Sequence, residues 1–158
     1  MRVSFDLDDV LFVSPDRFET EPPPHAPFDL IFKERLRKGT VDLIHTLQKE
    51  GFEVWVYTSS FRTESYIRHL FRHYGVRFDG IVNAQRHLKE VQKENKTVLP
   101  QKLPPKYRIS LHIDDETAIC SVAGQYGFQA YQLDAQDDNW KEKIIRRAEQ
   151  VKRIKHFV

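Results

Sequence analysis

Short apolar runs alternate along the chain with longer stretches in which apolar residues recur at helical spacing. The short runs occupy residues 2–6 (RVSFD), 53–58 (EVWVYT), 80–83 (GIVN), 108–114 (RISLHID) and 129–133 (QAYQL). Such runs favour strands, and strands that alternate with helices are typical of a parallel sheet. The pattern therefore predicts an α/β fold, a three-layer Rossmann-like sandwich around a mainly parallel five-stranded sheet.

Four stretches between or after these runs predict helices. The first ends at Gly51, and the second, over residues 63–74, ends at Gly75. Glycine is favoured at both places because it adopts the left-handed backbone that closes many helices. The other two helices are expected over residues 118–126 and 140–154.

Two segments interrupt the alternation. Residues 14–28 hold five of the eight prolines and predict an irregular flap after the first strand, because proline breaks helices and central strands. Residues 87–107 begin with a polar, lysine-rich stretch and continue with a proline-rich one, which predicts a short helix followed by a rigid extended connection.

Length and composition limit the class of protein. A chain of 158 residues is expected to form one domain. Its single cysteine, Cys120, excludes an internal disulfide and favours a reducing compartment. An aspartate already at position 6 and the absence of an ~18-residue apolar run argue against a signal peptide or a membrane span. The chain is therefore expected in the cytoplasm. The 25 basic and 23 acidic residues are mixed along it, which does not favour nucleic-acid binding.

Polar residues follow three of the predicted strands. In a parallel α/β sheet, ligands bind at the carboxyl ends of the strands, so these residues are candidates for chemistry. Pairs of aspartates also arise by chance, and Asp137-Asp138, which follows a polar residue, predicts only a surface turn. The order of the motifs is what is specific. They are Asp6 and Asp8 after the first strand, Thr58 and Ser59 after the second, a lysine, and Asp114 and Asp115 after the fourth.

This ordered set resembles the haloacid dehalogenase (HAD) superfamily, and the resemblance covers residues 2–116. It implies a small HAD-like hydrolase with a Mg²⁺ site. Val10 stands where the family usually has a threonine. The implied roles are Asp6 as nucleophile, Asp8 as acid/base, Thr58 as phosphate-binding hydroxyl with Ser59 as its substitute, and Asp6, Asp8, Asp114 and Asp115 as the metal site.

The lysine of the motif set has three candidates. Lys102 is favoured because the stretch Lys-Leu-Pro-Pro at 102–105 resembles a Lys-x-Pro-Pro element of some small bacterial members. Lys96 and Lys106 are the alternatives. Two further polar residues lie near the strand ends. Arg62 is a candidate for substrate contact, and His112 is expected to be a half-buried, hydrogen-bonded histidine rather than a metal ligand.

The chemistry of these residue types agrees with the implied roles. A phosphoryl group among carboxylates needs a bridging cation, and Mg²⁺ prefers hard oxygen ligands from one or two carboxylates, water and phosphate. A carboxylate such as Asp6 can form an acyl-phosphate if Lys102 and the metal stabilise the equatorial oxygens. Asp8 would then move the proton.

The spacing of the motifs also bears on the substrate. Thr58 lies 52 positions after Asp6, and Lys102 lies 44 positions after Thr58. Both intervals are mostly used by predicted elements, so no large cap is expected and the flap at 14–28 is the candidate lid. The expected function is a Mg²⁺-dependent phosphatase with an open site for a larger phosphorylated partner, or one completed by a second subunit of a homo-oligomer. The alternatives are a non-catalytic phosphate- or protein-binding module, a receiver-like signalling domain and a nucleic-acid-end phosphatase.

Overall fold

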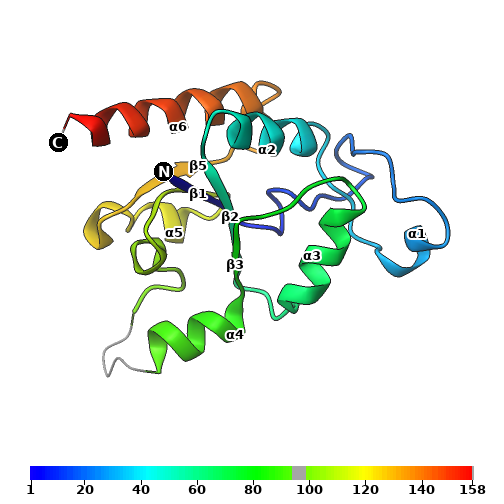
Figure 1. The fold of residues 1–158 in the computed structure, drawn as a ribbon, viewed down its shortest axis with the longest axis horizontal. Coiled ribbons are helices and arrows are strands. Elements are labelled where there is room, and N and C mark those ends of the chain that lie inside the picture. Colours follow the sequence, from blue (N-terminus) through cyan, green and yellow to red (C-terminus); the bar gives the residue numbers. More distant parts are fainter. Residues whose placement is uncertain (94–98, 158) are drawn as a thin grey trace.

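Five parallel strands form a single sheet in the order β3-β2-β1-β4-β5 in the computed structural model, which describes residues 1–93 and 99–157 (Figure 1). The predicted α/β fold is confirmed. Each strand lies within the run that predicted it. Their bounds are β1 (Arg2–Phe5), β2 (Glu53–Tyr57), β3 (Gly80–Val82), β4 (Ile109–Asp114) and β5 (Gln129–Gln132).

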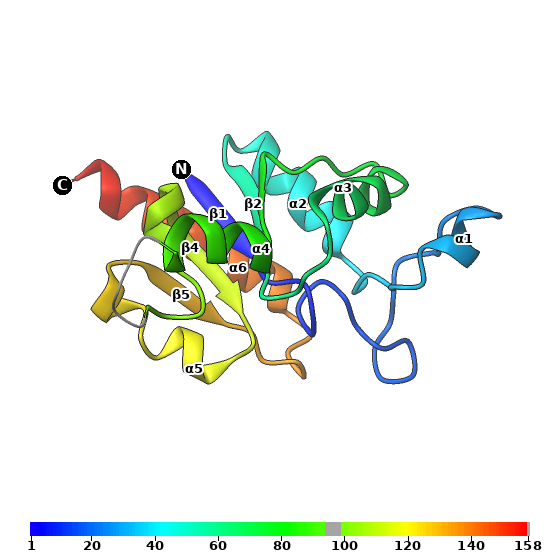
Figure 2. The same cartoon turned by 90° about the horizontal axis from the view of Figure 1, so that it is seen from below.

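Helices cover both faces of the sheet and complete the three layers. On one face lie α2 (Thr40–Lys49), α3 (Glu64–Arg72) and α6 (Trp140–His156). On the other lie α4 (Ala84–His87) and α5 (Thr117–Cys120). Figure 2 views the sheet with α4 in front of it and α6 behind. None of the described helices combines the length and the apolar character needed to cross a membrane.

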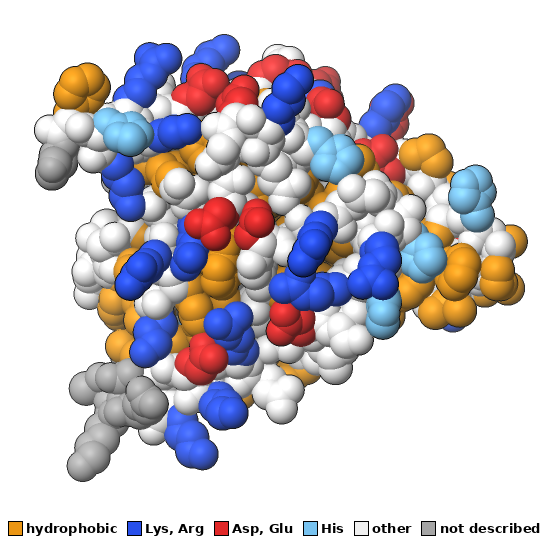
Figure 3. Space-filling model, in the orientation of Figure 1, with side chains coloured by type: hydrophobic (Ala, Val, Ile, Leu, Met, Phe, Trp, Pro, Cys, Tyr) orange, Lys and Arg blue, Asp and Glu red, His pale blue; other side chains and the backbone are white. Residues whose placement is uncertain are grey.

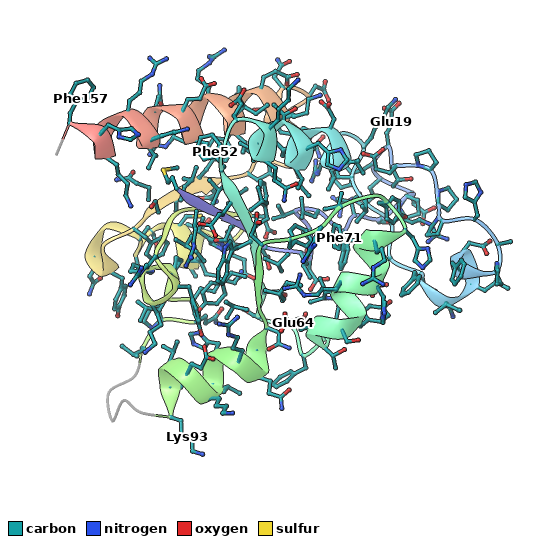
Figure 4. All side chains as sticks on the ribbon, in the orientation of Figure 1. Glu19, Phe52, Glu64, Phe71, Lys93 and Phe157 are labelled. Atoms are coloured by element: carbon teal, nitrogen blue, oxygen red, sulfur yellow. The ribbon has the colours of Figure 1, made fainter. Side chains whose placement is uncertain are left out.

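The larger apolar core lies between the sheet and the layer of α2, α3 and α6. Because successive strand residues point to opposite faces, every second residue of β1, β2 and β4 enters this core. Phe52 and Phe71, labelled in Figure 4, belong to it. The strand residues that it buries are Val3, Phe5, Val54, Val56, Leu111 and Ile113.

A smaller apolar cluster lies on the opposite face, against α4. It contains Trp55 and Tyr57 of β2 together with Tyr107. Gly80 of β3 lets the Trp55 ring lie flat against the backbone, since a β-carbon at that position would be 2.4 Å from the ring. Val82 of β3 and Ile109 of β4 also belong to this cluster, whereas Ser4 of β1 and His112 and Asp114 of β4 are buried polar residues.

Two of the helix predictions are wrong in extent. The helix expected over residues 118–126 is only the single turn α5, followed by a separate 3₁₀ turn at Gly124–Tyr126. Glycine in a helix interior costs about 1 kcal/mol relative to alanine, which favours a break at Gly124. The helix α6 continues two residues beyond the predicted end, to His156.

The connection between β3 and β4 also differs from the expectation. Its helix begins at Ala84, capped by the Asn83 side chain, and continues as a π-helical turn at Leu88–Gln92. The stretch expected to be extended ends in a 3₁₀ helix at Pro104–Tyr107. Proline is favoured in the first turn of a helix, where its fixed φ fits and its missing N–H is not needed.

Residues 14–28 are irregular, as predicted, and lead into the short helix α1 (Phe28–Ile31). Phe28 packs on His73, at the end of α3, with ring centroids 4.2 Å apart. Leu30 and Ile31 are exposed, and Figure 3 shows hydrophobic and histidine surface at this end of the molecule. The segment therefore forms a projection beside α3.

Candidate functional site

The predicted site residues from three strand ends lie at one edge of the sheet. Asp6 follows β1, Thr58 follows β2 and Asp114 ends β4, and these are the three central, adjacent strands. The sheet hydrogen bonding continues through them, since the Asp6 N–H donates to the Ile113 carbonyl at 2.9 Å. The parallel arrangement thus brings together residues more than 100 positions apart.

Lys102 connects the first and fourth strand ends. Its side chain is 1% exposed, and its Nζ lies 3.1 Å from Asp6 Oδ1 and 2.6 Å from Asp114 Oδ2. Of the two other candidates, Lys106 is exposed and Lys96 lies outside the described residues. Lys102 is therefore the lysine that the structure brings to the two aspartates.

The segment that carries Lys102 is held against β2. The backbone N–H of Leu103 donates to the Tyr57 hydroxyl at 3.0 Å, and the same hydroxyl is 2.6 Å from Nδ1 of His87 on α4. A side-chain hydrogen bond from the sheet thus fixes the backbone next to the lysine.

Four carboxylates gather around this centre. Oxygens of Asp6, Asp114, Asp115 and Glu116 lie within 4.8 Å of one another. Such a set of hard, anionic oxygens fits a Mg²⁺ ion. Among the described residues, the Asp8 carboxylate is not part of the cluster, although the sequence placed it in the metal site. Glu116, to which the sequence analysis gave no role, is part of it; its signal was its place directly after the aspartate pair.

The charges of these groups depend on burial. Burial raises the pKa of Asp6 to about 7, although Lys102 opposes the shift. Burial also raises the pKa of Asp115 to about 6, with the neighbouring Asp114 adding to the effect. For Asp114 burial acts in the same direction, but the hydrogen bond from His112 and the charge of Lys102 outweigh it and hold the pKa well below its usual range. A cation among these groups would stabilise their ionised forms.

Asp8 lies at the open side of the site, with its side chain 53% exposed. Both of its oxygens accept hydrogen bonds from the Arg62 guanidinium, at 2.9 and 3.0 Å. Arg62 also donates to Glu34 at 3.2 Å and lies over the Phe12 ring, 5.0 Å from its centroid. Arg62, a candidate for substrate contact, is therefore bound to the predicted acid/base.

The chain turns sharply at Asp9 and Val10, directly after the Asp6–Asp8 segment. Asp9 has a φ of +62°, in the left-handed region that non-glycine residues seldom adopt. Arg37, which is 5% exposed, donates to the carbonyl of Val10 at 3.0 Å and to those of Asp9 and Ala135 at 3.4 Å. These bonds hold the turn in the conformation that directs Asp8 to the open side.

The two predicted phosphate-binding hydroxyls differ in exposure. Thr58 is 1% exposed, and its Oγ1 accepts the Ser60 N–H and donates to Ser60 Oγ, both at 3.1 Å. Ser59 is exposed. The Thr58 hydroxyl thus shapes the loop after β2, while the Ser59 side chain faces solvent.

His112 is hydrogen-bonded, as expected, but the expectation of half burial is wrong. The side chain is 0% exposed, because Ser4 of β1 lies directly opposite and the Tyr57 ring lies 6.0 Å away. Its Nδ1 is 2.7 Å from Ser4 Oγ and its Nε2 is 2.8 Å from Asp114 Oδ2. Burial lowers the pKa of His112 to about 4, so the ring is neutral at pH 7.

Comparison with known proteins places the fold. No protein-family model and no curated protein sequence matches the chain. A structure described as a predicted HAD-like family hydrolase from Porphyromonas gingivalis is 14% identical, with a TM-score of 0.51, and the match covers 93% of this chain and 97% of that one.

Two further structures were solved with magnesium and phosphate. A HAD family enzyme from Bacteroides thetaiotaomicron is 13% identical with a TM-score of 0.52, covering 87% of this chain and 95% of that one. The D,D-heptose 1,7-bisphosphate phosphatase from B. bronchiseptica is 14% identical with a TM-score of 0.52, covering 92% and 86%. At these identities the likeness shows the fold, which is that of HAD-like hydrolases.

Proposed function

We propose that this chain, whose fold is that of HAD-like hydrolases, is a Mg²⁺-dependent phosphatase that acts through an aspartyl-phosphate on Asp6. The observation that supports it most strongly is the contact of Lys102 with both Asp6 and Asp114 inside a cluster of four carboxylates. A lysine buried between two aspartates at strand ends places a cation beside the group that would receive the phosphoryl.

The metal would be held by the carboxylates of Asp6 and Asp114, with Asp115 and Glu116 close enough to contribute. Bound there, Mg²⁺ supplies a positive charge that offsets the charge of the transferring phosphoryl group. Asp8 is assigned to acid/base chemistry alone, since Arg62 holds its carboxylate away from the cluster.

In the proposed reaction a carboxylate oxygen of Asp6 attacks phosphorus and the bond to the leaving oxygen breaks. Asp8 gives that oxygen a proton. Water then attacks the phosphorus of the aspartyl-phosphate and Asp8 takes its proton. The bond between phosphorus and the Asp6 oxygen breaks, which restores the carboxylate and releases inorganic phosphate. Lys102 stabilises the negative charge on the phosphoryl oxygens throughout. The loop of Thr58 and Ser59 orients the phosphate.

The proposed enzyme is one domain without a large cap. The chain between Asp8 and Thr58 forms the projection at 14–28, α1, α2 and β2, and the described part between Thr58 and Lys102 forms α3, β3, α4 and the turn after it. Asp8 is correspondingly exposed. We assign the protein a phosphorylated substrate that reaches the site from solvent.

The test is hydrolysis of an aryl phosphate by the wild type and Asp6→Asn, each with Mg²⁺ and with EDTA. We expect turnover to require the metal and to fall by a factor on the order of 10³ or more in Asp6→Asn, as for other nucleophile replacements. The matched control is Asp138→Asn, an exposed aspartate of the other acid pair, which should match the wild type.

Full activity in Asp6→Asn would contradict the proposal. If the wild type does not hydrolyse the aryl phosphate, the test is whether beryllium fluoride and Mg²⁺ form a stable adduct on the Asp6 carboxylate. An adduct on Asp6 supports the nucleophile, and its absence overturns it.

A further inference from the structure

The polar face of the sheet carries a ladder of four side chains below the proposed site. Ser4 of β1 lies opposite His112 of β4, and one step further along the two strands Asp6 and Asp114 follow on the same face. Ser4 and His112 are both 0% exposed. Two buried polar residues without access to solvent need partners, and here each finds one in the ladder.

The direction of the hydrogen bonds follows from the chemistry of the groups. The Asp114 carboxylate is paired with Lys102 at 2.6 Å, and a carboxylate accepts hydrogen bonds, so Nε2 of His112 carries a hydrogen and donates to Oδ2. With the ring hydrogen on Nε2, the other nitrogen, Nδ1, is the acceptor of that tautomer, and the Ser4 hydroxyl 2.7 Å away can donate to it. The Ser4 bond thus selects the tautomer that points a donor at Asp114.

These contacts occupy most of the Asp114 carboxylate. Its Oδ2 accepts from His112 at 2.8 Å and from Lys102 at 2.6 Å, which uses both lone pairs of that oxygen. Its Oδ1 accepts the Glu116 N–H at 3.1 Å and, among the described residues, has no second donor, which leaves one lone pair. The carboxylate is therefore fixed in orientation, with Oδ1 as the oxygen still able to bind a cation.

We propose that His112 and Ser4 are positioning residues that lock the Asp114 carboxylate so that Oδ1 is presented to the divalent cation. This inference rests on the proposed metal-dependent function. Neither residue touches the substrate or the metal, and both act through Asp114. Partners that orient a metal ligand in this way commonly change metal affinity by about 10- to 100-fold when removed.

The test is Mn²⁺ binding to the metal-free protein, measured by electron paramagnetic resonance, which does not depend on turnover. We expect His112→Leu to weaken binding by about 10- to 100-fold. His112→Gln, whose amide can still donate to Asp114, should recover part of the loss. Ser4→Ala should cause a smaller loss, because the histidine remains but its tautomer is no longer selected.

Ser110→Ala is the matched control. Ser110 is buried on the same strand, two residues before His112, but a register shift at this end of β4 separates it from the alternation of the ladder, and its hydroxyl contacts Lys155 of α6 on the other side of the sheet. It should bind Mn²⁺ like the wild type. In assays of phosphate hydrolysis, His112→Leu should need more Mg²⁺ for half-maximal rate while kcat at saturating Mg²⁺ stays close to that of the wild type.

Unchanged Mn²⁺ affinity in His112→Leu, or an equal loss in Ser110→Ala and Ser4→Ala, would overturn the positioning role and leave the proposed function intact. If the wild type binds no Mn²⁺, the proposed function fails and this inference with it. Should His112→Leu not fold by circular dichroism, Ser4→Ala and His112→Gln decide: wild-type affinity in both overturns the inference.

Discussion

The face of the sheet toward α2, α3 and α6 buries valine, leucine, isoleucine and phenylalanine, whereas the face toward α4 buries serine, histidine, aspartate and lysine beside a small aromatic cluster. The same three strands build both faces, because alternate residues of each strand point to opposite sides. Neighbours in sequence such as Phe5 and Asp6 therefore belong to different environments. One face supplies most of the apolar burial, and the other can hold charged groups because the first stabilises the fold.

The largest effect on stability is expected from Phe5→Ala. Phe5 is 0% exposed at the centre of the apolar face, and truncation of a buried phenylalanine costs about 4 kcal/mol of unfolding free energy. Urea unfolding measures it. The adjacent Asp6→Asn should stay as stable as the wild type while losing phosphatase activity. Equal destabilisation of both variants would remove the distinction between the faces.

Lys102→Met tests how much the buried ion pairs of the polar face contribute to the stability of the protein. Removal of the cation leaves Asp6 and Asp114 buried without their partner, and loss of one member of a buried ion pair costs about 3 kcal/mol or more. The exposed Lys106→Met is the matched control and should change the unfolding free energy by less than about 0.5 kcal/mol. If the two lysine variants have the same urea midpoint, the buried contacts of Lys102 are not stabilising.

Gly80→Ala asks how tightly the aromatic cluster of the polar face is packed. The added methyl would meet the Trp55 ring at 2.4 Å, so we expect a loss of about 2 kcal/mol, typical of overpacking. At Gly124 nothing lies within 4 Å of an added methyl, and Gly124→Ala should be neutral or slightly stabilising. If neither substitution changes the free energy of unfolding, as measured in urea, the aromatic cluster can move to make room for the added methyl group.

The smallest effect concerns pH. Burial lowers the pKa of His87, which packs against Tyr57 on the polar face. The unfolded chain then takes up a proton first, so the stability provided by neutral His87 is full above about pH 6.5 and is lost as the pH falls through the folded pKa. In His87→Gln the free energy of unfolding should depend less steeply on pH than in the wild type, by up to roughly 1 kcal/mol per pH unit. Thermal unfolding between pH 8 and 5 measures this, and parallel curves would contradict it.

The strands and their polar ends were predictable because both follow from local pattern. Alternating apolar runs identify β1, β2 and β4, and the parallel topology that they imply brings Asp6, Thr58 and Asp114 to one edge. The helix around α5 was predicted too long, because the apolar residues of 118–126 keep a helical spacing although the helix ends at Cys120 and a separate 3₁₀ turn begins at Gly124.

The pairing of the site residues could not be predicted in the same way. The Asp8–Arg62 and Ser4–His112 contacts join residues 54 and 108 positions apart, and nothing local to either residue specifies its partner. The lysines at 96, 102 and 106 have no periodicity that distinguishes them, and although the Lys-Leu-Pro-Pro stretch favoured Lys102, its contacts with Asp6 and Asp114 appear only in the tertiary structure. The fold could thus be predicted from the pattern of apolar and polar residues, whereas the partners of the site side chains depend on the tertiary packing.

The hydrogen bond from the Leu103 N–H to the Tyr57 hydroxyl has a consequence for the motion of the chain beside Lys102. An amide proton donated to a buried side chain exchanges with solvent deuterium only when that contact opens. Leu103 should therefore exchange slowly for a residue outside regular strands, and Tyr57→Phe should accelerate its exchange without altering any atom of the lysine. The position of the lysine would then be governed by the opening rate of a tyrosine contact on the neighbouring strand.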